Sequence, residues 1–182
     1  MILLGDKVKI TGIEAEDQGF MNELINDPDI EHMTAGECFP VSMHAQNTWF
    51  AVHGGDRDPL RLAVRDKTSS DIIGMIYIDS INRKNQSCST GIKLGVGMRG
   101  CGCGFDAVMT LCRFLFDEMN FHRVECKILD YNKPSQKLYE KCGFVLEGRL
   151  RETLWKNGKW RDQLVYSLLR TDWNRNTQSK FV

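Results

Sequence analysis

The sequence predicts an α/β (α+β) protein in which helices lie on a sheet of mostly antiparallel strands. Two apolar runs, 60–65 and 72–79, are joined by a polar turn, which is typical of a hairpin. An Asn157-Gly158 pair is a strong type I′ turn signal and predicts a second hairpin. Between the two hairpins, the glycine-rich stretch 94–104 separates a strand-like run from a run with helical periodicity, and that helix must pack on the sheet.

Turn and capping residues delimit the other elements. Helices are expected to start at residues that can cap a first turn and to end at Asp-Pro or glycine. In order, the chain predicts a strand at 8–13, a helix from Asp17 to Asp27-Pro28, a looser helical region, a helix that Ser42 caps and that stops at 53–55, strands at 60–65, 72–79 and 90–94, a helix over 105–119, a strand at 123–129, a short helix from Pro134 to just before Gly143, a strand at 144–146, a hairpin over 149–169 and a polar tail from Asn174.

Length and composition limit the class of protein. The chain has 182 residues, 42% of them hydrophobic, so we expect a single domain over 1–182. Its 24 lysines and arginines balance 24 aspartates and glutamates, which leaves no net charge to attract nucleic acid or a membrane. The first apolar stretch is too short for a signal peptide, and we expect a cytoplasmic protein. Seven scattered cysteines form no disulfide framework and are interpreted as reduced thiols.

The glycine-rich stretch has the properties of an anion site. Five glycines in residues 94–104 let the backbone turn tightly and expose its N–H groups. The first turn of the following helix adds unpaired N–H groups and the positive end of its dipole. Arg99 contributes a full positive charge at the rim, so a phosphate is the expected ligand.

Two other interpretations of this loop fit the residues less well. Three of its glycines match the dinucleotide pattern G-x-G-x-x-G, but the next strand ends at Asp130, about 30 residues past Gly100 and not the expected 20 or so. Cys101 and Cys103 are too close together for a zinc knuckle and have no second Cys/His pair, so no metal is expected. We interpret both cysteines as small side chains in a loop.

Two motifs resemble one family. Residues 99–104, Arg-Gly-Cys-Gly-Cys-Gly, match (Q/R)-x-x-G-x-(G/A), the pyrophosphate loop of the GNAT superfamily of acetyl-CoA-dependent N-acetyltransferases. Residues 132–144 closely resemble that superfamily's N-x-x-(S/A)-x-x-L-Y-x-x-x-G-F segment. Residues 121–123 and 147–148 and the closing hairpin are similar to the branch with ribosomal-protein alanine and spermidine acetyltransferases. The resemblance implies the GNAT fold, a mixed, mostly antiparallel sheet splayed between its fourth and fifth strands with helices on both faces.

The resemblance also implies acetyl-CoA as the cosubstrate. The pantetheine arm would lie between 90–94 and 123–129 and bond the edge of the first strand as an added strand would. The loop amides and the helix N-terminus would hold the pyrophosphate. The residues implied in cofactor binding are Ile92, Leu94, Arg99, Gly100, Cys101, Gly102, Cys103, Gly104, Asn132, Ser135 and Tyr139.

Two catalytic roles follow from the same resemblance. The Leu94 N–H would polarise the thioester carbonyl and stabilise the oxyanion, which is usually the largest electrostatic contribution to acyl transfer. Tyr139 would be the general acid that protonates the departing thiolate. Each residue has a structural alternative, since a tyrosine beside Leu138 can simply pack in the core and Asn132 can simply cap a helix.

The general base is not assigned by the resemblance. Many relatives in this branch carry a glutamate in the fourth strand, in a pattern like A-E-x-G-(I/Y), where this chain has Ser89. Glu125 in the predicted fifth strand is one candidate, although a structural role also suits it. Glu31, His32 and Glu37 come from the region that usually shapes the acceptor site and are further candidates. Water or the amine's own deprotonated fraction can also suffice.

The resemblance therefore implies an enzyme that transfers acetyl directly from acetyl-CoA to a primary amine. The acceptor is left open among a protein N-terminus, a polyamine and an amino sugar or antibiotic. The alternative is a non-catalytic acyl-CoA-binding or sensing module of the same fold, which Tyr139 argues against and the missing glutamate argues for. No nucleic acid or membrane partner is expected, and a homodimer is left open.

Overall fold

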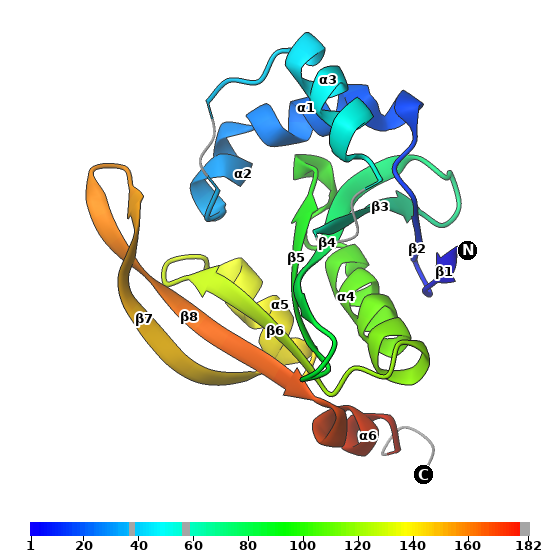
Figure 1. Ribbon diagram of the computed structural model, residues 1–182, viewed down its shortest axis with the longest axis vertical. Coiled ribbons are helices and arrows are strands. Elements are labelled where there is room, and N and C mark those ends of the chain that lie inside the picture. Colours follow the sequence, from blue (N-terminus) through cyan, green and yellow to red (C-terminus); the bar gives the residue numbers. More distant parts are fainter. Residues whose placement is uncertain (37–38, 56–58, 179–182) are drawn as a thin grey trace.

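A computed structural model describes residues 1–36, 39–55 and 59–178 of the chain (Figure 1). Within these residues eight strands form one sheet in the order β1-β2-β3-β4-β5-β6-β8-β7. Neighbouring strands are antiparallel except β5 and β6, which are parallel. The strands are β1 (Leu3–Leu4), β2 (Val8–Thr11), β3 (Leu60–Asp66), β4 (Ile72–Asn82), β5 (Ser87–Leu94), β6 (Arg123–Leu129), β7 (Val145–Lys156) and β8 (Lys159–Leu169).

Helices cover both faces of this sheet. Figure 1 shows α1, α2 and α3 gathered at one end of the molecule, with the long β7–β8 hairpin curving away from the other strands. No helix of the described ranges is long and apolar enough to cross a membrane. The helical elements are η1 (Ala15–Asp17), α1 (Gln18–Asn26), α2 (Pro28–Met33), α3 (Met43–His53), η2 (Val96–Met98), α4 (Cys103–Arg113), η3 (Phe114–Glu118), α5 (Lys133–Lys141) and α6 (Arg170–Gln178).

Local capping explains where several helices begin. The side chain of Asp27 accepts hydrogen bonds from the first N–H groups of α2, and Ser42 accepts one from Ala45 at the start of α3. Asn132 caps α5 in the same way, with Pro134 in the first turn. These positions confirm the helix starts that the sequence predicts at Ser42 and beside Pro134.

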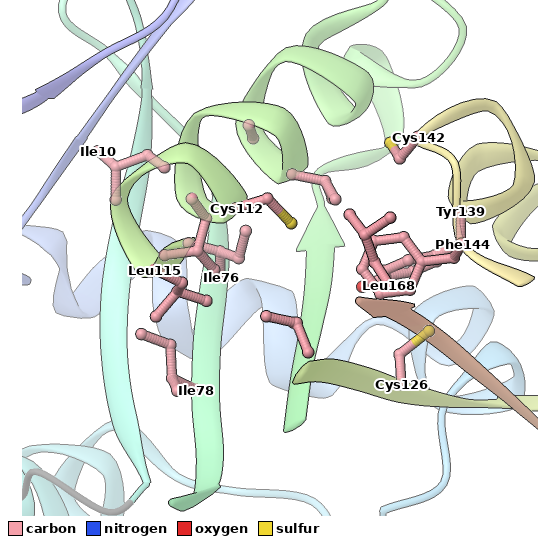
Figure 2. Packing of buried hydrophobic residues seen from close by; sticks show 14 of the residues in the cluster. Ile10, Ile76, Ile78, Cys112, Leu115, Cys126, Tyr139, Cys142, Phe144 and Leu168 are labelled. Atoms are coloured by element: carbon pink, nitrogen blue, oxygen red, sulfur yellow. The ribbon is translucent and has the colours of Figure 1, made fainter. Parts of the chain in front are cut away.

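The main core lies between the sheet and α4. Residues of α4 that recur at helical spacing, such as Ala107, Val108 and Leu111, are fully buried against the strands. Figure 2 shows Ile76, Cys112 and Leu115 grouped in this buried cluster. A smaller cluster on the other face joins Met21, Leu24 and Ile30 of α1 and α2 to strand residues that include Met75. The sheet is therefore a shared wall between two apolar layers.

Several boundaries differ from the sequence-based expectation. β1 precedes the predicted first strand, and it is two residues long, too short for periodicity to reveal. The helix predicted over 105–119 starts earlier, at Cys103, and its last turn widens into a π-helix over Phe114–Glu118. The strands predicted at 144–146 and from 149 are one strand, β7, interrupted by two register shifts.

The C-terminal tail is a further difference. The polar stretch from Asn174 continues a helix, α6, that starts at Arg170, and 179–182 lie outside the described residues. Trp173 is buried, and its indole N–H donates to the Asp117 carboxylate (3.1 Å) while its ring stacks on Phe116. One aromatic anchor therefore fixes a segment whose other residues are polar.

Candidate active site

The site forms where the two parallel strands diverge. β5 and β6 pair only over Ser87–Ser89 and Arg123–Glu125 among the described residues. Beyond this short ladder they separate, as Figure 1 shows, and a cleft of about 530 Å³ opens between them. The splay expected between the fourth and fifth strands is therefore confirmed. These strands are numbered β5 and β6 because the short strand β1 precedes the predicted first strand.

The edge of β5 offers backbone groups to this cleft. The Gly95 N–H donates to the Ile73 carbonyl (2.9 Å), which fixes the ladder to β4 at that end. Because successive N–H groups of a strand alternate in direction, those of Leu94 and Ile92 point away from β4 and into the gap. Both residues line the cleft, so the strand presents two unpaired donors to any extended ligand there.

The glycine loop forms one end of the cleft. Gly100 and Gly102 adopt φ values of 79° and 89°, a left-handed conformation that L side chains rarely adopt. With Arg99 and Gly104, both line the cleft, and α4 begins directly after Gly102. Cys101 and Cys103 are not among the lining residues.

A lysine that the sequence analysis did not consider reinforces this loop. Lys7, in the turn before β2, donates from its Nζ to the Cys101 carbonyl (2.6 Å). Cys103 is the first residue of α4 and is buried, so the interpretation of both cysteines as small loop side chains is wrong for Cys103. The proximity of the Cys101 and Cys103 side chains could not be found from spacing alone because it depends on the loop conformation.

α5 supplies the opposite wall. The Asn132 Oδ1 accepts from the Ser135 N–H (3.1 Å), and its Nδ2 donates to the Met33 carbonyl (2.9 Å). This asparagine therefore caps α5 and ties it to α2 across the cleft. Asn132 and Ser135 both line the cleft.

Tyr139 lies at the inner side of this wall. Its side chain is 2% exposed and packs edge-on against Phe144, with ring centroids 5.0 Å apart. Figure 2 shows the ring grouped with Phe144 and Leu168. Its hydroxyl is buried and has no hydrogen-bond partner among the described residues, and Tyr139 is one of the residues that line the cleft. Leaving a buried hydroxyl unpaired costs about 1–3 kcal/mol, so this group is suited to a ligand.

Burial also determines the protonation state of this phenol. Desolvation raises the pKa of Tyr139 well above its ordinary value, and the nearby thiol of Cys126 adds to the effect. The phenol therefore keeps its proton throughout the neutral range. A protonated hydroxyl beside the cleft can donate to an atom that gains negative charge there.

The carboxylate expected as a candidate base lies outside the cleft lining. Arg123 donates to Glu125 (3.3 Å) and more closely to Glu147, and Ser167 also donates to Glu147 (2.7 Å). These hydrogen bonds lower the pKa of Glu147 to about 2, with Arg123 as the larger cause. Glu125 is thus part of an ion-pair brace and does not line the cleft.

The strand register reveals a second carboxylate. Asp79 on β4 is the direct cross-strand partner of Ser89, and Glu125 on β6 is the partner on its other side. Cross-strand partners share a face, so two carboxylates flank the position where many relatives carry a glutamate. Tyr77 lies two residues along the same face of β4, and its ring covers Gly91, where an added Cβ would overlap the phenol.

The acceptor-side candidates from the N-terminal region have structural partners. Glu31 and Lys156 form an ion pair, and His32 stacks on Tyr131 with centroids 5.0 Å apart. The His32 Nδ1 also lies 2.9 Å from the Asn157 amide nitrogen, so α2 is attached to the turn of the β7–β8 hairpin. Glu37 lies outside the described residues.

The charge of the cleft is positive. Five cationic side chains line it and no Asp or Glu of the described residues does; the cations are Lys93, Arg99, Lys127, Lys137 and Lys141. Within the described part of the chain, no three His, Cys, Asp or Glu side chains lie close enough together to share a metal ion. An anionic ligand is therefore favoured by electrostatics alone.

Comparison with known families identifies the family to which the chain belongs. Residues 7–145 match the family described as the acetyltransferase (GNAT) domain. The chain belongs to the GNAT acetyltransferase family. It is 26% identical over 172 residues to an uncharacterized N-acetyltransferase of the SPbeta prophage of Bacillus subtilis, covering 94% of this chain and 95% of the relative. It is also 28% identical over 137 residues to the ribosomal protein uS5 alanine N-acetyltransferase of Escherichia coli, covering 75% and 71%. As a member of this family, the chain is an N-acetyltransferase.

A solved structure shares the fold. The spermidine N-acetyltransferase of Vibrio cholerae in complex with CoA and spermine superposes with a TM-score of 0.84 at 24% identity, covering 92% of this chain and 98% of that one. An acetyltransferase of the GNAT family from Bacillus anthracis has a TM-score of 0.82 at 19% identity, covering 94% and 99%. These matches confirm the GNAT fold predicted from the two sequence motifs.

Proposed function

We propose that acetyl-CoA occupies the cleft between β5 and β6 and that its sulfur meets the hydroxyl of Tyr139. The observation that supports this most directly is that Tyr139 lines the cleft with a hydroxyl that is buried and unpaired within the described residues. The loop amides at Gly100–Gly104 and the Arg99 side chain would hold the pyrophosphate, and the edge of β5 would bond the pantetheine arm. The cationic lining matches the negative charge of the CoA phosphates.

The acetyl group would pass directly to the acceptor. The amine attacks the thioester carbon, the Leu94 N–H stabilises the oxyanion, and Tyr139 donates to the sulfur as the C–S bond breaks. Cys126 is the thiol that lines the cleft, and burial raises its pKa, which keeps it protonated at neutral pH. A route through an acetyl-cysteine at this position is therefore disfavoured.

Asp79 is the carboxylate that best fits the role of proton acceptor. It lies beside Ser89, at the end of the β5–β6 ladder from which the two strands diverge. Arg123 pairs with Glu125 and not with Asp79. Tyr77, on the same face of β4 as Asp79, lines the cleft. Its negative charge contributes to raising the pKa of Tyr77 to about 12, although burial is the larger cause. Like Glu125, Asp79 lies outside the cleft lining, so it would receive the proton of the attacking amine through water.

The charges on the acceptor face favour a substrate with a single ammonium group. Lys93 and Lys127 share the face that carries Tyr77 and α2, because their neighbours Leu94 and Cys126 lie on the opposite face. The reacting amine would approach Asp79 and Glu125 beside Ser89, while the rest of the acceptor would lie along Lys93 and Lys127. A protein N-terminus fits this arrangement better than a polyamine, whose additional positive charges would meet these lysines.

The experiment that tests this function is release of free thiol from acetyl-CoA in the presence of an amine panel. We expect turnover with peptides that have a free N-terminus, and kcat/KM at least about tenfold lower for spermidine, equivalent to roughly 1.4 kcal/mol of unfavourable charge interaction. A preference for spermidine would overturn the acceptor assignment. Tight binding of acetyl-CoA without turnover on any amine would favour the sensing module.

A further inference from the structure

A pair of thiols lies in the turn that leads into α4. The Sγ atoms of Cys101 and Cys103 are 3.0 Å apart, with Gly102 between the two residues in a left-handed conformation. Cys101 is exposed, whereas Cys103 is buried at the start of the helix. A disulfide bond is about 2.05 Å long, so the two sulfurs need approach by only about 1 Å to bond.

The two thiols differ in chemistry. The Cys103 thiol and N–H can both donate to a Cys101 thiolate, which lowers the pKa of Cys101, and the nearby Lys7 ammonium adds a smaller effect. Burial raises the pKa of Cys103 to about 11, and the Cys101 sulfur is a further cause. Cys101 is therefore suited to attack and Cys103 to resolve, the division of roles found in dithiol exchange sites.

The other described cysteines provide a contrast. Cys88 and Cys142 are buried, and burial raises the pKa of each to about 12. Cys112 and Cys126 are buried as well, and their pKa values are also raised by desolvation. Reactivity with an oxidant in solution should therefore concentrate at Cys101.

We propose that Cys101 and Cys103 form a thiol–disulfide exchange site that reacts with low-molecular-weight disulfides. The Cys101 thiolate attacks one sulfur of the disulfide RSSR, its S–S bond breaks, and one RS⁻ leaves. The Cys103 thiol loses its proton and attacks the Cys101 sulfur, which expels the second RS⁻. The two leaving thiolates take up the protons released by the cysteines, so two protein thiols are oxidised as one RSSR is reduced to two RSH.

Oxidation should weaken the binding of acetyl-CoA, a consequence that rests on the proposed function of the loop. The bridge closes a small ring through Gly102 and includes the Cys103 N–H, one of the amides at the start of α4. It also moves the Cys101 sulfur, which lies 3.2 Å from the Met98 carbonyl, at the end of η2. Closing the ring therefore reorients the amides that would contact the pyrophosphate.

The bridge can be tested without CoA. Reduced protein in a Cys38→Ser background is equilibrated in mixtures of reduced and oxidised glutathione, quenched, alkylated and mapped by mass spectrometry. We expect a reversible Cys101–Cys103 bridge with the four buried cysteines still alkylated only after unfolding. The Cys103→Ser variant should instead accumulate a glutathione adduct at Cys101. If excess oxidised glutathione gives no such bridge, or gives it elsewhere, the exchange site is wrong.

The coupling to the cosubstrate is tested with acetyl-CoA, which has no free thiol. The oxidised protein should bind it at least about tenfold more weakly than the reduced protein, and reduction should restore the affinity. By linkage, saturating acetyl-CoA should shift the glutathione ratio at half oxidation by the same factor. Equal affinities of the two forms would contradict the coupling. If the reduced protein bound no acetyl-CoA, the proposed function would fail, whereas the bridge is judged by the preceding measurement.

Discussion

The paired half and the open half of the β5–β6 junction differ in whether the polar side chains beside them have hydrogen-bond partners. In the closed half, where Ser87–Ser89 pair with Arg123–Glu125, the charged side chains of β6 have protein partners. Arg123 joins Glu125 to Glu147, and Glu147 also accepts from Ser167. In the open half, the Tyr139 hydroxyl is buried and has no partner among the described residues.

This difference distinguishes polar groups that brace the fold from a polar group that is suited to bind a ligand. A buried polar group without a partner destabilises the fold, and a ligand bound in the open half would compensate for that cost. The brace in the closed half links β6 to Glu147 of β7 and Ser167 of β8 beside the β5–β6 ladder. The unpaired groups lie where the strands have moved apart, as expected if acetyl-CoA completes their hydrogen bonds.

The largest expected effect comes from removing the unpaired hydroxyl. Tyr139→Phe preserves the ring that packs on Phe144, so the fold and the affinity for acetyl-CoA should survive. The single-turnover acetylation rate should fall by roughly 10² to 10⁴-fold, the range for loss of a positioned acid. Tyr166→Phe, which alters a buried phenol outside the cleft lining, is the matched control. A Tyr139→Phe rate within about threefold of the parent would reduce Tyr139 to a packing residue.

Carboxylates on either side of Ser89 give the next comparison. Asp79→Asn should lower kcat/KM at neutral pH by about 10²-fold, the lower end of the range for a positioned base. Glu125→Gln should change it by less than about threefold, because Glu125 belongs to the brace with Arg123. Rates across pH 6–9 would check this, since the Asp79→Asn deficit should shrink as more amine is deprotonated in solution. The reverse ranking of the two variants would return the base to Glu125.

A smaller effect is expected in the loop. Gly102→Val places a β-branched residue at φ 89°, and relief of about 1–3 kcal/mol of strain should shift the loop amides. The affinity for acetyl-CoA, measured by calorimetry, should fall about ten- to a hundredfold. Gly97→Ala is the control, because an added Cβ there meets no atom within 4 Å. Unchanged affinity of the valine variant would place the phosphates elsewhere.

The smallest effect belongs to the closed half. The pKa of Glu147 is lowered in the fold to about 2, so its carboxylate stabilises the protein above its unfolded pKa of about 4.3 and loses that contribution as the pH falls toward 2. Glu147→Gln should cost about 1 kcal/mol or less at pH 7, since the pair lies near the surface. Its denaturant midpoint should vary less with pH between 4.5 and 2 than that of the parent. A parallel pH dependence of the two proteins would show that the brace contributes nothing.

Local signals in the sequence predicted the parts of the site that are built from contiguous residues. The loop at 99–104, the cap at Asn132 and the turn at Asn157-Gly158 all depend on backbone conformations that neighbouring residue types favour. Asn157 and Gly158 do adopt positive φ values of 50° and 72°. The splay was implied by family resemblance, and the register that confirms it involves strands about 35 residues apart.

The features that were missed depend on contacts between distant segments. Asp79 becomes a candidate only when the register shows that it faces Ser89, and Lys93 only when the cleft lining is known. The contact of Lys7 with Cys101 joins residues 94 positions apart. Periodicity and spacing carry no information on such pairs, which explains why the sequence left the general base unassigned and why Cys103 was taken for a loop residue.

The most direct test of the central claim is a crystal structure of the protein with CoA bound. The account predicts the CoA sulfur within hydrogen-bonding distance of the Tyr139 hydroxyl, the pantetheine amides bonded to the edge of β5, and the pyrophosphate at the amides that follow Gly100. The ion pairs of Arg123 with Glu125 and Glu147 should be unchanged. A CoA molecule that leaves the Tyr139 hydroxyl unpaired, with its sulfur outside the gap between β5 and β6, would contradict the account.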